Sequence, residues 1–280
     1  MDKHHSRRTL PWRDACATIR LVTMKTLLKA ADRHIPVLTN NRVQARNLRI
    51  LEKLLLERDG ERRLLVLGAG EAGVPIQHKR VRCTLTDVRD HPTIDVLCDA
   101  HDLPFGEAEF DAVVAIAMLE HVADPAQVVS EIHRVLKPDG LVYSEIPFLQ
   151  RVHAGAHDYT RFTMLGHRRL FRMFDTIELV QVAGAASSLA WAINGFGLAV
   201  FGRGRKRWYL ADRMTRLLFW WLPRLDRLLA APASADSACG TAFLGRRAAY
   251  AIDDRDIAQL YRGAVPTRTW SWESPPRSSS

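Results

Sequence analysis

The chain has 280 residues, of which 47% are hydrophobic and 25% charged, a composition that suits one large globular domain with additions. Its net charge of +9 predicts anionic surroundings such as nucleic acid, membrane lipid or a phosphorylated substrate. The four cysteines form no Cys-x-x-Cys pair, which argues against a metal finger or a disulfide framework and favours a reduced, cytoplasmic protein. The first twenty residues are studded with charges, so we expect no secretory signal.

Helices are predicted before the first strand. One lies near residues 17–34, within a basic stretch. The second spans residues 41–60, where leucines recur at helical spacing with charges between them. Residues 1–60 are therefore expected to be a basic, helical extension.

Short apolar runs then alternate with helices or loops. Seven such runs cover residues 63–70, 82–88, 93–99, 110–118, 140–148, 175–184 and 239–250. A helix begins at Pro125, and another is capped by Thr163. Apolar strands without alternating polarity predict an α/β fold: a Rossmann-like, mostly parallel seven-stranded sheet with helices on both faces, over residues 61–250.

A helical insertion of residues 185–238 separates the last two strands. The stretch 179–202 carries no charge, but its polar residues and glycines argue against a membrane span. Residues 185–230 contain eight basic and two acidic residues, a net charge of +6, beside several aromatic residues. This combination predicts contact with an anionic membrane surface. Residues 251–280 form a tail whose Ser- and Pro-rich end predicts partial disorder.

A glycine motif follows the first strand. Gly68, Gly70 and Gly73 have the G-x-G-x-x-G spacing, which allows a tight turn and close approach of a ligand to the backbone. A helix is expected to follow and to present its N-terminus to that ligand. Asp87, nineteen residues after Gly68, would take the ribose hydroxyls. The glycine motif together with Asp87 is compatible with both NAD(P) and S-adenosylmethionine.

The next stretch distinguishes the two cofactors. The segments "CDAHDLPFGEAEFDAVVAIAMLEHVADP" and "EIHRVLKPDGLVYSEIPF" resemble the class I S-adenosylmethionine-dependent methyltransferases, in the type 11 branch with the pattern D-x-x-x-L-P-F…F-D…E-H. The resemblance covers residues 64–175 and the last strand. It implies a methyltransferase whose cofactor is S-adenosyl-L-methionine.

The same resemblance implies the cofactor-binding residues. Gly68, Ala69 and Gly70 would pass under the methionine part, and Asp87 would hold the ribose. Asp99, with Ala100 behind it, would read the adenine edge, and Ala117 to His121 would line the end of the fourth strand. The family usually has an acidic residue two positions before the first glycine. Here that residue is Val66, so the methionine ammonium needs another acceptor or binds more weakly.

The segment "RVHAGAHDYTRFT", residues 151–163, follows the fifth strand at the edge where such sheets bind ligands. His153 and His157 are four residues apart, yet Gly155 between them and the lack of a third ligand argue against a metal, so none is expected. Two interpretations remain for the segment: Asp158 and Arg161 tie the loop to the sheet, or its polar side chains face an acceptor.

Glu120 and His121 likewise either hold a loop and cap the next helix or contact substrate. The catalytic candidates are His121, His153, His157, Asp158 and Tyr159.

The expected reaction is O-methylation of a small-molecule or glycan-type acceptor, because "H-D-Y-x-R-F-T" also resembles bacterial methyltransferases of glycan assembly. A nucleic-acid methyltransferase is the alternative suggested by the charge, although no recognition module is visible. An NAD(P)-dependent oxidoreductase is a further alternative, but this chain has no Tyr-x-x-x-Lys pair for hydride transfer. The last alternative is an inactive, membrane-associated binding module, because Val66 replaces the acid expected in an active enzyme. The expected location is the cytoplasm, with peripheral membrane attachment, and the oligomeric state stays open.

Overall fold

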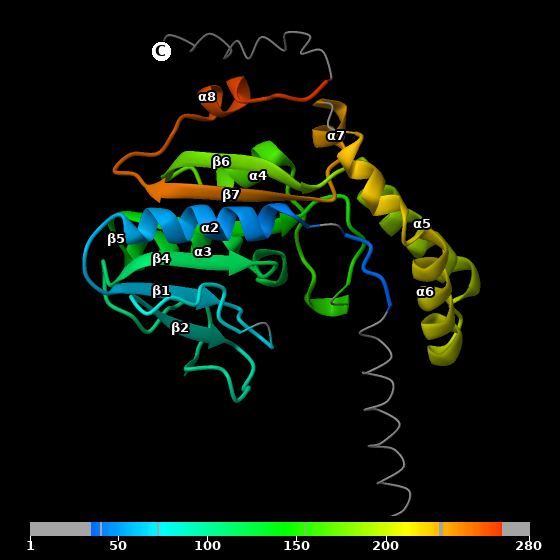
Figure 1. Ribbon diagram of the computed structural model, residues 1–280, viewed down its shortest axis with the longest axis horizontal. Coiled ribbons are helices and arrows are strands. Elements are labelled where there is room, and N and C mark those ends of the chain that lie inside the picture. Colours follow the sequence, from blue (N-terminus) through cyan, green and yellow to red (C-terminus); the bar gives the residue numbers. More distant parts are fainter. Residues whose placement is uncertain (1–34, 40, 72, 154, 230–231, 265–280) are drawn as a thin grey trace, which may run out of the picture.

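The computed structural model describes residues 35–39, 41–71, 73–153, 155–229 and 232–264, and its centre is one seven-stranded sheet (Figure 1). The strand order is β3-β2-β1-β4-β5-β7-β6, and only β7 runs antiparallel to its neighbours among the pairs described. The predicted α/β, Rossmann-like sheet is confirmed. The strands are β1 (Arg62–Leu67), β2 (Val81–Asp87), β3 (Val96–Leu97), β4 (Phe110–Ile116), β5 (Leu136–Pro147), β6 (Phe174–Ala183) and β7 (Gly240–Arg247).

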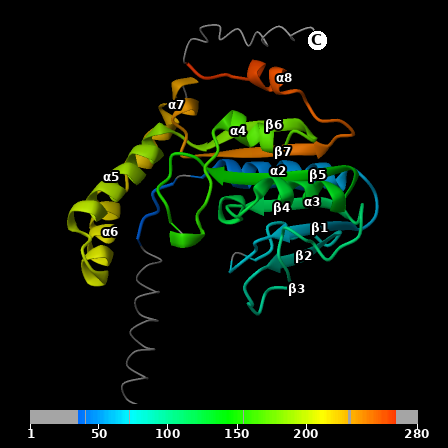
Figure 2. The same cartoon turned by 180° about the vertical axis from the view of Figure 1, so that it is seen from behind.

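Helices cover both faces of the sheet (Figures 1 and 2). On one face, Leu51 and Leu55 of α2 (Val43–Leu56) pack into a core cluster with Leu64 of β1. On the other, Ile132 of α3 (Pro125–Val135) packs with Phe171, which follows α4 (Met164–Leu170). The central strand β4 is buried at every position but its last, because apolar side chains meet it from both sides.

The two helices on the second face begin at side-chain caps. Asp124 accepts hydrogen bonds from the N–H groups of Ala126 and Gln127, both at 3.0 Å, ahead of Pro125 in the first turn of α3. Thr163 caps α4 as predicted, by accepting from the N–H of Gly166 at 3.0 Å. The expectation that Glu120 and His121 cap the helix after β4 is wrong, because Asp124 makes that cap.

The glycine loop departs from prediction, since no helix follows it among the described residues 68–71 and 73–80. Three glycines with positive φ and Pro75 leave no run of residues that favours a helix between β1 and β2. Ile76, 3% exposed, packs from this connection into the α2 core cluster, so a single side chain covers part of the sheet that a helix would otherwise cover. The helix N-terminus expected at the ligand site is therefore missing from that part of the chain.

The insertion between β6 and β7 is helical, as predicted. It consists of α5 (Ala185–Phe201), α6 (Arg205–Phe219), the 3-10 helix η3 (Leu222–Arg227) and α7 (Pro232–Asp236). Helices α5 and α6 form a hairpin that extends away from the sheet on the side toward which the parallel strands point (Figure 1). The carboxylate of Asp226 holds the first turn of α5 by accepting from the N–H groups of Gly184 and Ala186 and from the Ser187 hydroxyl.

Two other predictions concern the chain ends. A short helix, α8 (Asp254–Gln259), contacts α4 through an Arg169–Asp254 ion pair of 3.1 Å, so residues 251–264 include ordered structure. The helix predicted near residues 17–34 and the end of the tail, residues 265–280, lie outside the described residues. Within the part of the chain that is described, no helix is long and apolar enough to cross a membrane.

Candidate active site

The glycine loop turns sharply at the carboxyl end of β1. Gly68 has a φ of +64° and Gly70 a φ of +48°, conformations that favour glycine. A Cβ on Gly68 would lie 2.8 Å from the Cβ of Met118, which follows β4. Ala69 between them is buried and donates its N–H to the carbonyl of Thr86. The loop thus needs glycine at residue 68 both for its conformation and for its close approach to the end of β4.

Asp87 ends β2 beside this loop. Its Oδ2 accepts the N–H of Gly70 at 3.0 Å, and its Oδ1 accepts the N–H of Arg89 at 2.8 Å. The residue is 7% exposed, so the two backbone bonds hold a buried carboxylate in place at the edge of the sheet. This is the position at which the sequence predicted a ribose-binding acid.

Asp99 and Ala100 follow the short strand β3. Asp99 accepts from the backbone N–H of His101 at 2.9 Å and contacts its Nδ1 at 2.6 Å, and these two hydrogen bonds lower the pKa of Asp99. The Nε2 of His101 in turn accepts the N–H of Asp124, which caps α3. Ala100 is buried, whereas the Asp99 side chain is 63% exposed and accessible to a ligand.

Val66 lies in β1 where the resemblance calls for an acid. Its side chain is 6% exposed and packs in the core cluster that includes Leu51 and Leu55. A carboxylate at residue 66 would have to replace an apolar group in that core. The departure from the family pattern is therefore a difference in core packing as well as in ligand chemistry.

On the far side of β4 lies a buried carboxylate. Ala117 has a φ of +50° and donates its N–H to the carbonyl of Glu145 at 3.0 Å, which turns the chain into η1 (Leu119–His121). Glu120 in this turn is fully buried, and neither of its carboxylate oxygens has a hydrogen-bond partner within the described residues. Burial raises the pKa of Glu120.

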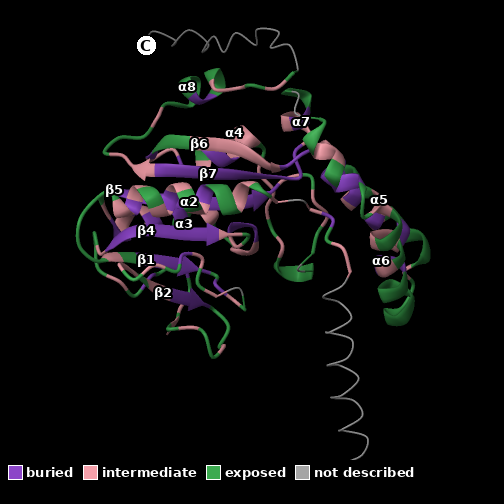
Figure 3. Cartoon of the chain, viewed as in Figure 1, coloured by how far each residue is buried: buried purple, intermediate pink, exposed green. Residues whose placement is uncertain are grey.

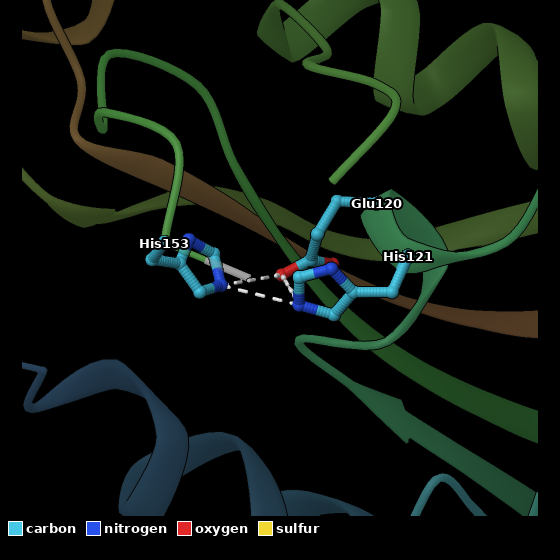
Figure 4. A group of neighbouring side chains, drawn as sticks. All are labelled: Glu120, His121 and His153. Carbon is cyan, nitrogen blue, oxygen red and sulfur yellow. Dashed lines mark hydrogen bonds and ion pairs between the residues drawn. The ribbon is translucent and has the colours of Figure 1, made fainter. Parts of the chain in front are cut away.

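Two histidines meet beside this carboxylate (Figure 4). The Nε2 atoms of His121 and His153 are 3.1 Å apart, and they lie 3.6 Å and 3.9 Å from Oε1 of Glu120. His121 comes from the turn after β4 and His153 from the loop after β5. Burial lowers the pKa of His153.

The remaining predicted residues hold the loop that carries His153. Asp158 forms a two-pronged ion pair with Arg161 and accepts the N–H of His153 at 2.9 Å. Although burial opposes the shift, these hydrogen bonds lower the pKa of Asp158 to about 2. His157 contributes its carbonyl, 2.7 Å from Nδ1 of His121, and Tyr159 donates its N–H to the carbonyl of Glu120. The side chain of Tyr159 is exposed.

A cavity of about 170 Å³ opens beside the cluster. Ala117, Glu120 and His153 line it together with Glu145, which the sequence analysis did not select. Glu145 is 6% exposed, accepts hydrogen bonds from the Tyr143 hydroxyl and from Nδ2 of Asn41, and has a pKa raised by burial. An acidic residue inside the apolar run "LVYSEIPF" was the available signal for it.

The match to known proteins coincides with this geometry. Residues 65–144, from β1 into β5, match the family model described as a methyltransferase domain. Over these residues, which are less than half of the chain, the sheet domain is similar to methyltransferase domains. This finding favours S-adenosylmethionine over NAD(P), which the glycine motif alone left open.

Curated relatives resemble this chain over limited lengths. A probable S-adenosylmethionine-dependent methyltransferase of Mycolicibacterium smegmatis is 33% identical over 144 residues, 50% of this chain and 51% of that protein. The mitochondrial arginine-hydroxylase NDUFAF5 of Mus musculus is 46% identical over 52 residues, 19% of this chain and 15% of its own length. A ubiquinone biosynthesis O-methyltransferase of Pseudomonas paraeruginosa is 34% identical over 79 residues, 22% of this chain and 33% of the relative.

In these three cases the match covers about half of the relative or less.

The similarity to methyltransferases implies S-adenosylmethionine as the cofactor, and the residues present fit it. The Gly68–Gly70 turn places side-chain-free backbone beside Asp87, and Asp87 offers a fixed, buried carboxylate for two hydroxyls. Asp99 and Ala100 stand at the next strand end, where a nucleobase edge would lie. Nothing acidic occupies residue 66, so the methionine ammonium must find its acceptor outside β1.

Proposed function

We propose that this protein transfers a methyl group from S-adenosylmethionine to a hydroxyl of a small-molecule or glycan-type acceptor. The observation that carries the proposal is the cavity beside Ala117, which is lined by the buried carboxylates of Glu120 and Glu145 and by His153. Acceptors that are already strong nucleophiles need no such groups, whereas a hydroxyl must lose its proton as it reacts.

The cofactor supplies an electrophilic methyl group on a sulfonium, so the chain's own task is to position the acceptor and to remove one proton. His121 and His153 position the acceptor oxygen at the end of the cavity. Glu145 accepts the proton, because a carboxylate whose pKa is raised by burial is a stronger base than an exposed one. His157 holds His121 through its carbonyl, Asp158 holds His153, and the N–H of Tyr159 holds the carbonyl of Glu120.

A test measures cofactor binding and acceptor chemistry separately. Isothermal titration with S-adenosylhomocysteine should show binding that Asp87→Ala weakens about 10- to 100-fold, because hydrogen bonds to a charged group are lost. Asp90→Ala, an exposed acid nearby, is the matched control. Transfer of a labelled methyl group is then followed on panels of saccharide hydroxyls, amines and carbon acids. Label on amines or carbon alone would overturn O-methylation, and absence of cofactor binding would overturn the whole proposal.

We also propose that the α5–α6 hairpin attaches the protein to an anionic membrane surface. Much of the hairpin is exposed (Figure 3). Its large exposed apolar residues include Phe196, Phe201 and Leu210, at 71%, 66% and 62% exposure. Arg203 and Arg207 line a groove of about 470 Å³ together with apolar residues of both helices. Basic and apolar groups side by side favour anionic lipid.

Nucleic acid is the second candidate partner, supported by the same basic residues, and would imply a nucleic-acid acceptor. The exposed aliphatic side chains of the hairpin favour lipid over nucleic acid, because a phosphate backbone offers them little to pack against. Competition between vesicles and RNA separates the two partners.

A further inference from the structure

Three metal-ligating side chains converge where the sequence analysis expected no metal. Glu120 and His121 lie in η1 after β4, and His153 lies in the loop after β5, so the cluster joins two strand ends (Figure 4). One ligand atom from each of the three lies within 4.8 Å of the others. The sequence pattern suggested His153 and His157 as a pair. It did not reveal this set, because His153 follows His121 by 32 residues in the chain.

Each histidine directs its Nε2 into the cluster because its other nitrogen faces an acceptor. Nδ1 of His121 is 2.7 Å from the carbonyl oxygen of His157, which can only accept, so Nδ1 carries a hydrogen and Nε2 a lone pair. Nδ1 of His153 is 3.4 Å from Oδ2 of Asp158, which favours the same tautomer. Two lone pairs then face one another at 3.1 Å, an arrangement that a metal ion or a shared proton between them relieves.

The carboxylate of Glu120 also favours a bound cation. It is fully buried, and within the described residues neither oxygen accepts a hydrogen bond. A buried polar group without a partner is strongly unfavourable, and a buried carboxylate is more so unless it is paired or binds a metal. Its Oε1 is aimed at the two imidazole nitrogens, at 3.6 Å and 3.9 Å.

We propose that Glu120, His121 and His153 bind a zinc ion and leave a fourth position open to the cavity. Ligand atoms about 2.1 Å from a tetrahedral zinc ion lie roughly 3.4 Å apart. The three separations here, 3.1, 3.6 and 3.9 Å, lie on either side of that value. Two imidazoles and one carboxylate with an open position are the donor set of catalytic zinc sites. The His157 carbonyl and the Asp158–Arg161 pair supply the outer contacts that fix the rings of metal-binding histidines.

The role of this ion rests on the proposed function. Glu120 and His153 both line the cavity, so an acceptor oxygen entering it reaches the fourth position. Coordination by zinc lowers the pKa of a bound hydroxyl and fixes the direction of its lone pair. The ion would thus position the oxygen, and Glu145 on the same cavity would receive its proton.

The experiment titrates Zn²⁺ and Co²⁺ into the chelator-stripped full-length protein, without acceptor. His4→Ala and His5→Ala are present in every sample, because adjacent histidines at the start of the chain could bind metal themselves. We expect one ion per chain by calorimetry and the visible absorption of tetrahedral Co²⁺. Glu120→Gln, His121→Ala and His153→Ala should each weaken binding at least tenfold, while His78→Ala, a histidine outside the cluster, should not.

Far-ultraviolet circular dichroism and the urea unfolding midpoint serve as the folding control, because neither depends on a bound ligand. Variants that keep the wild-type fold by these measures and lose the metal support the site. Absence of a stoichiometric ion, or an affinity that none of the three substitutions changes, would overturn the metal site. The contact between the two histidines would then be explained by a proton that they share. Metal binding without methyl transfer to any hydroxyl would instead contradict the proposed function and leave the metal site standing.

Discussion

Glu145 and Glu120 are both buried carboxylates on one cavity, yet their surroundings differ. Glu145 is held by the Tyr143 hydroxyl and by Asn41, whereas Glu120 has no hydrogen-bond partner among the described residues. A carboxylate that is oriented by two donors can take a proton without moving, and one that lacks donors is suited to a cation. Their different surroundings therefore suit Glu145 to act as a base and Glu120 to bind a metal ion, although both line the same cavity.

Glu145→Gln tests the assignment of the base. The amide keeps the size of the side chain and its contact with Asn41 but cannot take a proton, so kcat should fall about 10²- to 10⁴-fold, the contribution typical of a general base. Steady-state transfer of a labelled methyl group measures the loss, and titration with S-adenosylhomocysteine should show unchanged affinity. An unchanged kcat would remove Glu145 from the chemistry.

His167 allows a prediction about stability that is independent of function. It lies in α4 and is fully buried against β5 and β7, where its ring contacts the Ser144 and Thr241 hydroxyls, and burial lowers its pKa to about 3. Between pH 3 and about 6.5 the unfolded chain binds a proton that the folded chain excludes, so the free energy of unfolding rises with pH there.

Replacement by His167→Gln should flatten this rise by up to about 1.4 kcal/mol per pH unit. Urea unfolding of both proteins between pH 4 and pH 7 measures it. The difference between the two curves isolates His167 from the carboxylates that titrate in the same range. Parallel curves would show that the ring is accessible to protons in the folded state.

At the scale of elements, the strands and the helices α3 and α4 were predictable because local signals agree with the tertiary structure. Apolar runs, the Asp124–Pro125 start and the Thr163 cap all point to the elements observed. The structure of the loop after β1 was not predictable, because the G-x-G-x-x-G spacing occurs both in loops that lead into a helix and in loops that do not. The cluster of Glu120 with the two histidines could not be predicted from the sequence either, since its contacts form only when the ends of β4 and β5 become neighbours in the sheet.

The hairpin of α5 and α6 carries the prediction at this scale. The protein should sediment with phosphatidylglycerol vesicles and much less with phosphatidylcholine vesicles, because its basic residues add about 1 kcal/mol each near an anionic surface. Arg203→Glu with Arg207→Glu should weaken this binding about 30-fold or more, and Phe196→Ser with Phe201→Ser at least tenfold.

Tyr250→Ser is the matched control, since Tyr250 is 87% exposed but lies outside the hairpin. Equal binding to both vesicle types would contradict an anionic lipid surface. Displacement from vesicles by RNA at low concentration would favour the nucleic-acid alternative.

Across the whole molecule, one side chain links the hairpin to the active-site loop. Arg151, two residues before His153, donates to Oδ1 of Asn194 in α5 at 2.9 Å and lies 3.5 Å from Asp212 in α6. Its guanidinium also lies over the rings of Trp191 and Trp208, at 5.2 Å and 6.0 Å. The element proposed to touch lipid and the loop proposed to touch the acceptor are therefore held in one geometry.

Arg151→Ala should break that link without touching the cofactor cradle. The loop that carries His153 would lose its anchor on both helices, so kcat/KM for the acceptor should fall about tenfold, a change of roughly 1.4 kcal/mol. Affinity for S-adenosylhomocysteine and binding to phosphatidylglycerol vesicles should both stay unchanged, because neither uses the Arg151 side chain. Arg151→Lys keeps the charge but not the planar fork and should recover only part of the loss. If kcat/KM stayed at the wild-type value in both variants, the loop would hold its geometry through the Asp158–Arg161 pair alone.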